Sequence, residues 1–131
     1  MEKTTVANAI SALTAGIFEI EQEDDTLIVV PVVDLREPDY QRIEAGAGEI
    51  LELLNGIGIK NIILDFGKTN YYGSTALGFC LMLWNRVKVR NGRMAFCNVL
   101  AHEKEIPQMT HLDHFWPICS SRIEALKAVK H

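Results

Sequence analysis

The chain has 131 residues, of which 48% are hydrophobic and 23% are charged, and its formal net charge is −4. This length and balance predict one globular domain rather than a disordered or fibrous chain. The net negative charge argues against a nucleic-acid-binding surface, because such surfaces need clustered lysine and arginine.

The first residues are small and polar, so we interpret 1–14 as an N-terminal extension and 15–131 as a single domain. The extension lacks the apolar run and basic flank of a signal peptide, and the aliphatic run LIVVPVV is too short to span a bilayer. The three cysteines form no CxxC pair, which favours free thiols in a reducing compartment. These features predict a cytoplasmic protein without membrane insertion.

The hydrophobic pattern predicts strands first. Residues 16–24 alternate in polarity, which indicates a half-exposed strand, and 26–35 are continuously apolar, which indicates a buried strand. Pro31 interrupts this second strand, so we expect a bulge or an unpaired edge there.

Helices and strands then alternate along the chain. We expect a helix from Pro38 that ends near Gly56, a strand at 60–66, a helix from 74 that ends at Asn91–Gly92, a strand at 93–99, a short helix at 101–109, an extended segment at 114–119 and a last helix at 120–130. This order predicts an α/β fold with a mainly parallel sheet of four to five strands and an antiparallel edge strand.

Two short motifs resemble catalytic loops but lack a defining glycine. GKT follows a strand, as in a phosphate-binding loop, yet the glycine required five positions earlier is Ile62. YGSTA has Tyr72 and Ala76 where a nucleophile elbow needs glycine. We therefore expect neither a P-loop nor a serine hydrolase.

His111, Asp113 and His114 form the densest group of metal-ligand residue types. Because this segment is expected to turn into a strand, the two histidines do not share a helical face, and we interpret them as ordinary loop residues. Elsewhere no convergent acid, base and nucleophile set is found, so we predict a non-enzyme without a cofactor or metal.

Ser74 and Thr75 open the predicted helix at 74–90. A hydroxyl here caps unpaired backbone N–H groups, and a phosphate is also accommodated by those groups and the helix dipole. A plain cap and a phosphorylation switch therefore both fit, since a charge of about −1.5 to −2 would repel a partner without unfolding the domain.

The same helix is apolar on more than one side. One stripe, expected to pack on the sheet, consists of Leu77, Cys80, Leu81, Trp84 and Val87, and apolar character extends to Ala76, Phe79, Met82 and Leu83. Either the helix is buried on several sides, or it carries a docking surface for a partner, with Arg86 and Arg90 at its rim.

The segments NIILDF, STALG, RNGR, HLDHFWPI and EAL together resemble, in order and spacing, the STAS domain of anti-sigma factor antagonists. The resemblance covers roughly residues 15–130 and implies a STAS-like fold with helices mostly on one side. It also implies that a partner kinase, often an anti-sigma factor, phosphorylates the motif, and that a metal-dependent phosphatase restores it. By position, the acceptor falls on Thr75, and Ser74 is the residue before it.

We therefore predict a regulatory protein that binds such a partner along residues 74–86. The predicted contact residues are Asp34, Asp39, Gly73, Ala76, Phe79, Met82, Leu83 and Arg86. Asp34 and Asp39 compete for the place of an aspartate that the family carries after its second strand, and Gly73 replaces the family's aspartate before the hydroxyl pair.

Two alternatives remain at this point. The loss of that aspartate at Gly73 favours a STAS module without phosphorylation, which acts as a scaffold or beside a transporter. A small-ligand or nucleotide-binding domain would use the same helix N-terminus and would be stabilised by a phosphate-containing ligand.

Overall fold

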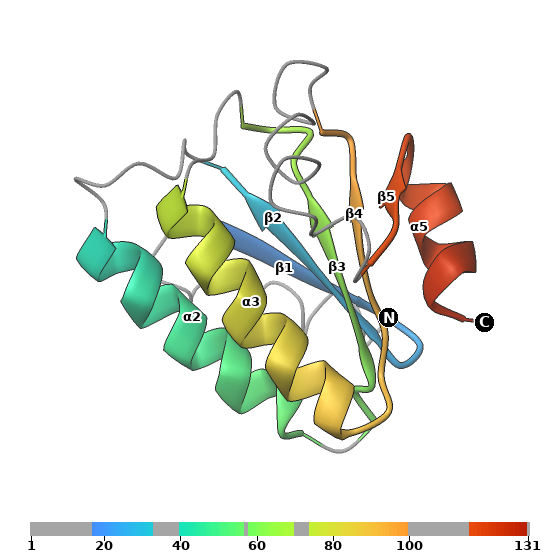
Figure 1. The fold of residues 1–131 in the computed structure, drawn as a ribbon, viewed down its shortest axis with the longest axis horizontal. Helices are drawn as coiled ribbons and strands as arrows, with labels where there is room; N and C mark the ends of the chain where they lie inside the picture. Colours follow the sequence, from blue (N-terminus) through green and yellow to red (C-terminus); the bar gives the residue numbers. More distant parts are fainter. Residues whose placement is uncertain (1–16, 33–39, 57, 70–73, 100–115, 131) are drawn as a thin grey trace.

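A five-stranded sheet with the order β1-β2-β3-β4-β5 forms the centre of the domain (Figure 1). The computed structural model describes residues 17–32, 40–56, 58–69, 74–99 and 116–130. The strands are β1 (Phe18–Glu23), β2 (Thr26–Pro31), β3 (Asn61–Asp65), β4 (Met94–Cys97) and β5 (Ile118–Cys119). Only the β1–β2 pair is antiparallel among these strands, which confirms the predicted sheet.

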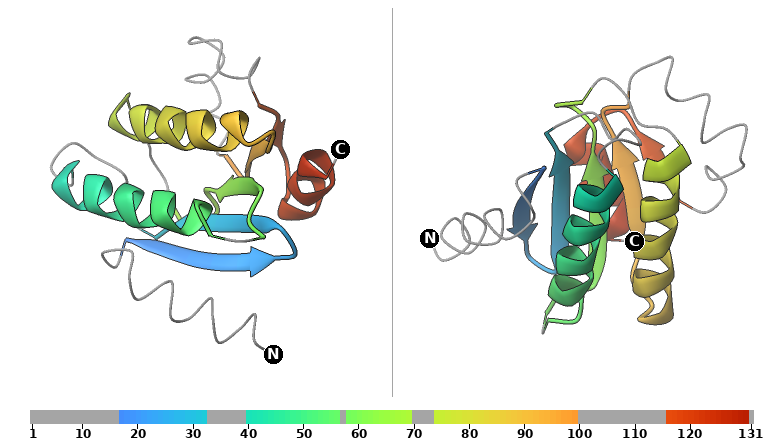
Figure 2. Two further views of the ribbon diagram at one scale, coloured as in Figure 1. Left: turned by 90° about the horizontal axis from the view of Figure 1, so that it is seen from below. Right: turned by 90° about the vertical axis from the view of Figure 1, so that its left-hand side faces the viewer.

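Helices cover both faces of this sheet, as Figure 2 shows from two sides. The helices α2 (Tyr40–Leu54) and α3 (Ser74–Val89) lie on one face, and α5 (Arg122–Val129) packs on the other, against β3 and β4. The prediction of helices mostly on one side is confirmed. Both faces of β2 and β3 are apolar, so both faces of the sheet need a cover. The larger core lies between the sheet and the helices α2 and α3.

The sequence pattern accounts for α2 directly. Ile43, Ala47, Ile50 and Leu54 recur at spacings of three and four residues and are all at most 2% exposed. The glutamates Glu44 and Glu52 are exposed on the other side. The helix is therefore amphipathic.

Pro31 causes no bulge, and the unpaired edge that was expected as the other possibility is confirmed. It lies in regular register opposite Phe18, and the Val32 N–H continues the ladder by donating to the Ile17 carbonyl at 2.9 Å. Since neighbouring residues of a strand point their N–H groups to opposite sides, the Pro31 nitrogen faces away from β1. Pairing of β2 with β3 already ends at Val29, so the missing donor breaks no ladder bond.

The C-terminal ends of α2 and α3 differ in backbone conformation. Gly56 does not adopt the left-handed conformation expected of a terminating glycine; instead Gly58, two residues later, has φ 90°. At the end of α3, Asn91 is left-handed with φ 61°, and the Gly92 N–H donates to the Val87 carbonyl at 2.7 Å. The predicted stop at Asn91–Gly92 is therefore confirmed, because this is the usual geometry of a helix C-terminus.

Several predictions lie outside the described residues. They are the extension at 1–14, the short helix at 101–109 and the histidines of the segment 111–114. The extended segment expected at 114–119 is described in part, as the short edge strand β5.

Candidate partner-binding site

The candidate site lies where β3 ends and α3 begins. β3 ends at Asp65, and α3 starts at Ser74, so Ser74 and Thr75 are in the first turn of the helix, as predicted. The side chains of residues 74–76, and Asp34, Asp39 and Gly73 altogether, lie outside what the structure describes. In a parallel sheet the region beyond the carboxyl ends of the strands is the usual position of binding residues.

A buried carboxylate, that of Asp65 at the end of β3, accepts hydrogen bonds from three other parts of the chain. Asp65 is 5% exposed, and its Oδ1 accepts hydrogen bonds from the Gly67 N–H and from Asn98 Nδ2, both at 2.9 Å. Its Oδ2 accepts from Arg122 Nε at 3.0 Å. Asp65 thus joins the end of β3 to the end of β4 and to the first turn of α5.

The network extends across the sheet to β1. The Arg122 Nη1 donates to both carboxylate oxygens of Glu21 at 3.1 Å, while the same guanidinium holds Asp65. In the sequence, Asp65 stands out only as part of the motif NIILDF. Asn98 and Arg122 do not stand out, because they are 33 and 57 residues away from Asp65 and no local pattern connects them.

The pKa of Asp65 reflects two opposing effects. Burial raises the pKa, but the hydrogen bonds from Asn98, from the Gly67 N–H and from Arg122, with the nearby Arg122 charge, outweigh burial and hold the pKa below its usual value. The folded protein therefore favours the ionised carboxylate. Because the folded pKa is lower than the unfolded one, this stabilisation is fully present above the unfolded pKa and is lost as the pH falls.

We expect Asp65→Asn to lower the free energy of unfolding by about 2 kcal/mol at pH 7, because three donors lose a charged acceptor. The difference between the wild type and the variant should shrink as the pH falls below about 4, where the unfolded carboxyl group takes up a proton. Urea unfolding of both proteins between pH 7 and pH 3 measures this difference. A difference that stays constant over this range would contradict the assigned role.

Helix α3 is buried on more than one side, and this corrects part of the predicted docking surface. Phe79 and Leu83 are 3% and 0% exposed, so they belong to the core rather than to an exposed contact surface. The Phe79 ring stacks on Phe18 of β1 with 5.2 Å between centroids. Leu81, expected to face the sheet, is instead 37% exposed. Phe79 and Leu83 are buried because α3 packs against α2 as well as against the sheet.

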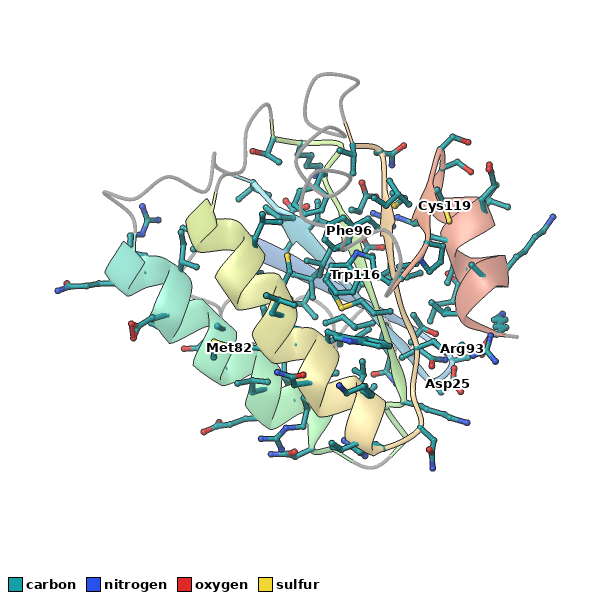
Figure 3. All side chains as sticks on the ribbon, viewed as in Figure 1. Asp25, Met82, Arg93, Phe96, Trp116 and Cys119 are labelled. Atoms are coloured by element: carbon teal, nitrogen blue, oxygen red, sulfur yellow. The ribbon has the colours of Figure 1, made fainter. Side chains whose placement is uncertain are left out.

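The exposed part of α3 borders a shallow groove that it shares with α2. The groove has a volume of about 510 Å³ and is lined by Leu51, Met82, Asn85, Arg86, Val89 and Arg90. Met82 is 47% exposed and is labelled in Figure 3, and Val89 is 74% exposed. Arg86 is held in place because its Nη1 donates to Asn55 Oδ1. Met82 and Arg86 are therefore the predicted contact residues that the structure places at the surface.

No metal or membrane feature is found in the described part of the chain. Within it, no group of three histidine, cysteine or carboxylate side chains is placed to hold a metal ion, and no helix has the length and apolar character needed to cross a bilayer. Cys80, Cys97 and Cys119 are free thiols, as predicted, and burial raises the pKa of Cys97 to about 12. Cys97 is thus protonated, rather than a thiolate nucleophile, at neutral pH.

Comparison with known sequences gives one curated relative. No protein-family model matches the chain. BtrV of Bordetella bronchiseptica, which carries the name of an anti-sigma factor antagonist, is 25% identical over 73 residues. The match covers 56% of this chain and 63% of BtrV, so it spans less than two thirds of that relative.

Solved structures match over almost the whole domain. A Thermotoga maritima protein named as an anti-sigma factor antagonist has a TM-score of 0.75 at 19% identity, over 90% of this chain and 98% of its own. A STAS domain protein of Planctomyces limnophilus has 0.71 at 23% identity, over 87% and 98%. Unphosphorylated SpoIIAA has 0.71 at 18% identity, over 86% and 96%. The resemblance seen in the sequence is thus confirmed: the chain has the STAS fold, and the proteins it is similar to are anti-sigma factor antagonists.

Proposed function

We propose that this protein is a non-catalytic regulator that binds an anti-sigma factor through α3, and that phosphorylation of Thr75 or Ser74 switches this binding. The observation that carries the proposal is the position of these residues in the first turn of α3. The backbone N–H groups of a first helical turn have no intrahelical acceptor, and they favour an added phosphate.

The electrostatics of this turn support a phosphorylated state. The first turn of α3 contains no acidic residue that would repel a phosphate. One structural neighbour, SpoIIAA of Bacillus, is known in a phosphorylated and an unphosphorylated form, and both have the fold of this chain, with TM-scores of 0.62 and 0.71. A phosphate can therefore be added to a domain of this fold without destroying it.

The exposed groove lies within reach of that charge. Positions 75 and 82 are seven residues apart in α3, which is about two turns, or roughly 10 Å, along one side of the helix. A partner that covers Met82 and extends along this side toward the helix N-terminus would meet the phosphate. Its negative charge, together with desolvation, would then oppose binding.

The first test is the intact mass of the protein isolated from its native cells, before and after phosphatase treatment. We expect one phosphatase-sensitive phosphate, and peptide mapping should place it on Thr75 or Ser74, with Thr75→Ala separating the two. If no phosphate is found under either growth or stress, the phosphorylation switch is wrong. The alternative is then a module that binds its partner constitutively, without phosphorylation, which is the alternative that Gly73 favours.

A second arm of the same experiment tests the surface. Met82→Asp should lose the protein that the unphosphorylated wild type captures from a native lysate. The control is Ile123→Asp, since Ile123 is also apolar and 67% exposed but lies on α5. Equal capture by both variants would show that the groove is not the contact surface.

A further inference from the structure

A polar pocket lies at the edge of the sheet where β3 and β4 begin, opposite to the edge that carries residues 74 and 75. It has a volume of about 260 Å³, and its polar lining consists of Asp25, Lys60, Asn61, Asn91, Arg93 and Lys130. We propose that this pocket binds a small molecule that carries a phosphate group next to an ammonium or hydroxyl donor. The proposal does not depend on the phosphorylation of α3.

Four segments that are distant in the chain converge on this pocket. Asp25 comes from the β1–β2 turn, Asn61 from the start of β3, Arg93 from the connection between α3 and β4, and Lys130 from the end of α5. Figure 3 shows Asp25 and Arg93 side by side near the end of α5. The pocket is thus made by the tertiary fold rather than by a single loop.

The backbone around the pocket is held by hydrogen bonds. The Asp25 carbonyl accepts from the N–H groups of Lys60 at 2.7 Å and of Asn61 at 3.0 Å. The Asn61 side chain is 3% exposed, and its Oδ1 accepts from the Arg93 N–H at 2.9 Å. These bonds fix the backbone positions from which the charged side chains extend, so the backbone of the pocket needs no rearrangement to receive a ligand.

Positive charge collects in the pocket although the protein is acidic overall. Lys60, Arg93 and Lys130 line it, against a net charge of −4 for the whole chain. Lys130 pairs with the exposed Asp24 at 3.6 Å, whereas Lys60 and Arg93 form no ion pair with any residue that the structure describes. Two cations with no ion-pair partner in the described part of the chain repel each other in one pocket, and a bound phosphate would relieve this repulsion with charge-assisted hydrogen bonds.

Asp25 gives the pocket a second requirement. Its Oδ1 lies 3.3 Å from Thr26 Oγ1 and 3.4 Å from Asn61 Nδ2, both of which donate to it. Its Oδ2 has no hydrogen-bond partner among the described residues. A purely anionic ligand would be repelled by this carboxylate, whereas a ligand with an ammonium or hydroxyl group beside its phosphate would satisfy it. The volume, below the roughly 300 Å³ of the smallest drug-sized sites, limits the ligand to a small molecule.

The test is titration calorimetry of the full chain at constant ionic strength with three probes: O-phosphoethanolamine, inorganic phosphate and ethanolamine. We expect saturable binding of one O-phosphoethanolamine per chain, about tenfold weaker binding of phosphate and none of ethanolamine. Asp25→Asn should remove the preference for O-phosphoethanolamine over phosphate. Thr75→Ala should bind all three probes as the wild type does, because α3 begins at the other edge of the sheet.

A matched pair of variants distinguishes a site from diffuse charge. Arg93→Gln should weaken O-phosphoethanolamine binding at least tenfold, and Lys60→Gln should weaken it as well. Lys127→Gln removes the same charge from an exposed position of α5 outside the pocket and should leave the affinity unchanged. Equal losses in Arg93→Gln and Lys127→Gln, or no saturable binding to the wild type, would overturn the proposal.

Discussion

Phe79→Ala is expected to lower the free energy of unfolding by about 3–5 kcal/mol, the usual cost of removing a buried aromatic ring. Phe79 is 3% exposed and stacks on Phe18 at 5.2 Å between ring centroids. The ring therefore connects α3 to β1 at the edge of the sheet, and its removal leaves a cavity between them. The midpoint of urea denaturation, with an unchanged slope, measures the loss.

Met82→Ala is the matched control, because Met82 lies three residues further along the same helix and is 47% exposed. We expect its cost to stay below about 1 kcal/mol. Similar losses in the two variants would mean that Phe79 is not a core residue. For studies of partner binding the consequence is direct: substitutions at Phe79 report on stability, whereas those at Met82 report on the surface.

Gly92→Ala is expected to destabilise the protein by about 3 kcal/mol or more, as overpacking against a fixed backbone does. A Cβ atom at Gly92 would lie 1.8 Å from the Lys60 carbonyl oxygen and 3.1 Å from the Val87 carbonyl oxygen. Both are backbone atoms, so no side-chain rotation relieves the clash. The connection from α3 to β4 would have to move away from the start of β3.

Gly48→Ala serves as the control for the helix-forming tendency of alanine. Gly48 lies inside α2, and no atom would come within 4 Å of its added Cβ. Alanine is expected to stabilise this helix by about 0.5–1 kcal/mol. Thermal unfolding of both variants against the wild type measures the two effects, and a stabilised Gly92→Ala protein would contradict the close approach.

Local sequence was enough to predict the elements that the structure describes. Apolar residues at spacings of three and four in α2, and continuous β-branched runs in β2 and β3, depend only on neighbouring residues and on helix or strand geometry. The Asn91–Gly92 pair in the sequence likewise predicted the end of α3, where the structure shows Asn91 in the left-handed conformation. The set of motifs also sufficed to identify the resemblance to STAS domains, although no single motif carried it.

Only the tertiary structure decided which apolar residues of α3 are buried. The pattern left open whether Phe79, Met82 and Leu83 form a core or a docking surface, because one helix does not encode how many neighbours cover it. Packing against both α2 and the sheet buries Phe79 and Leu83 and leaves Met82 exposed.

The polar networks also depended on folding. Asp65 meets Asn98 and Arg122 across 33 and 57 residues, and the proposed phosphate pocket combines side chains from four separate segments. Such contacts have no signature in a local window, because parallel pairing and helix crossover place distant residues side by side. The sequence by itself thus determined the described elements and their order, and long-range packing decided which side chains meet and which lie at the surface.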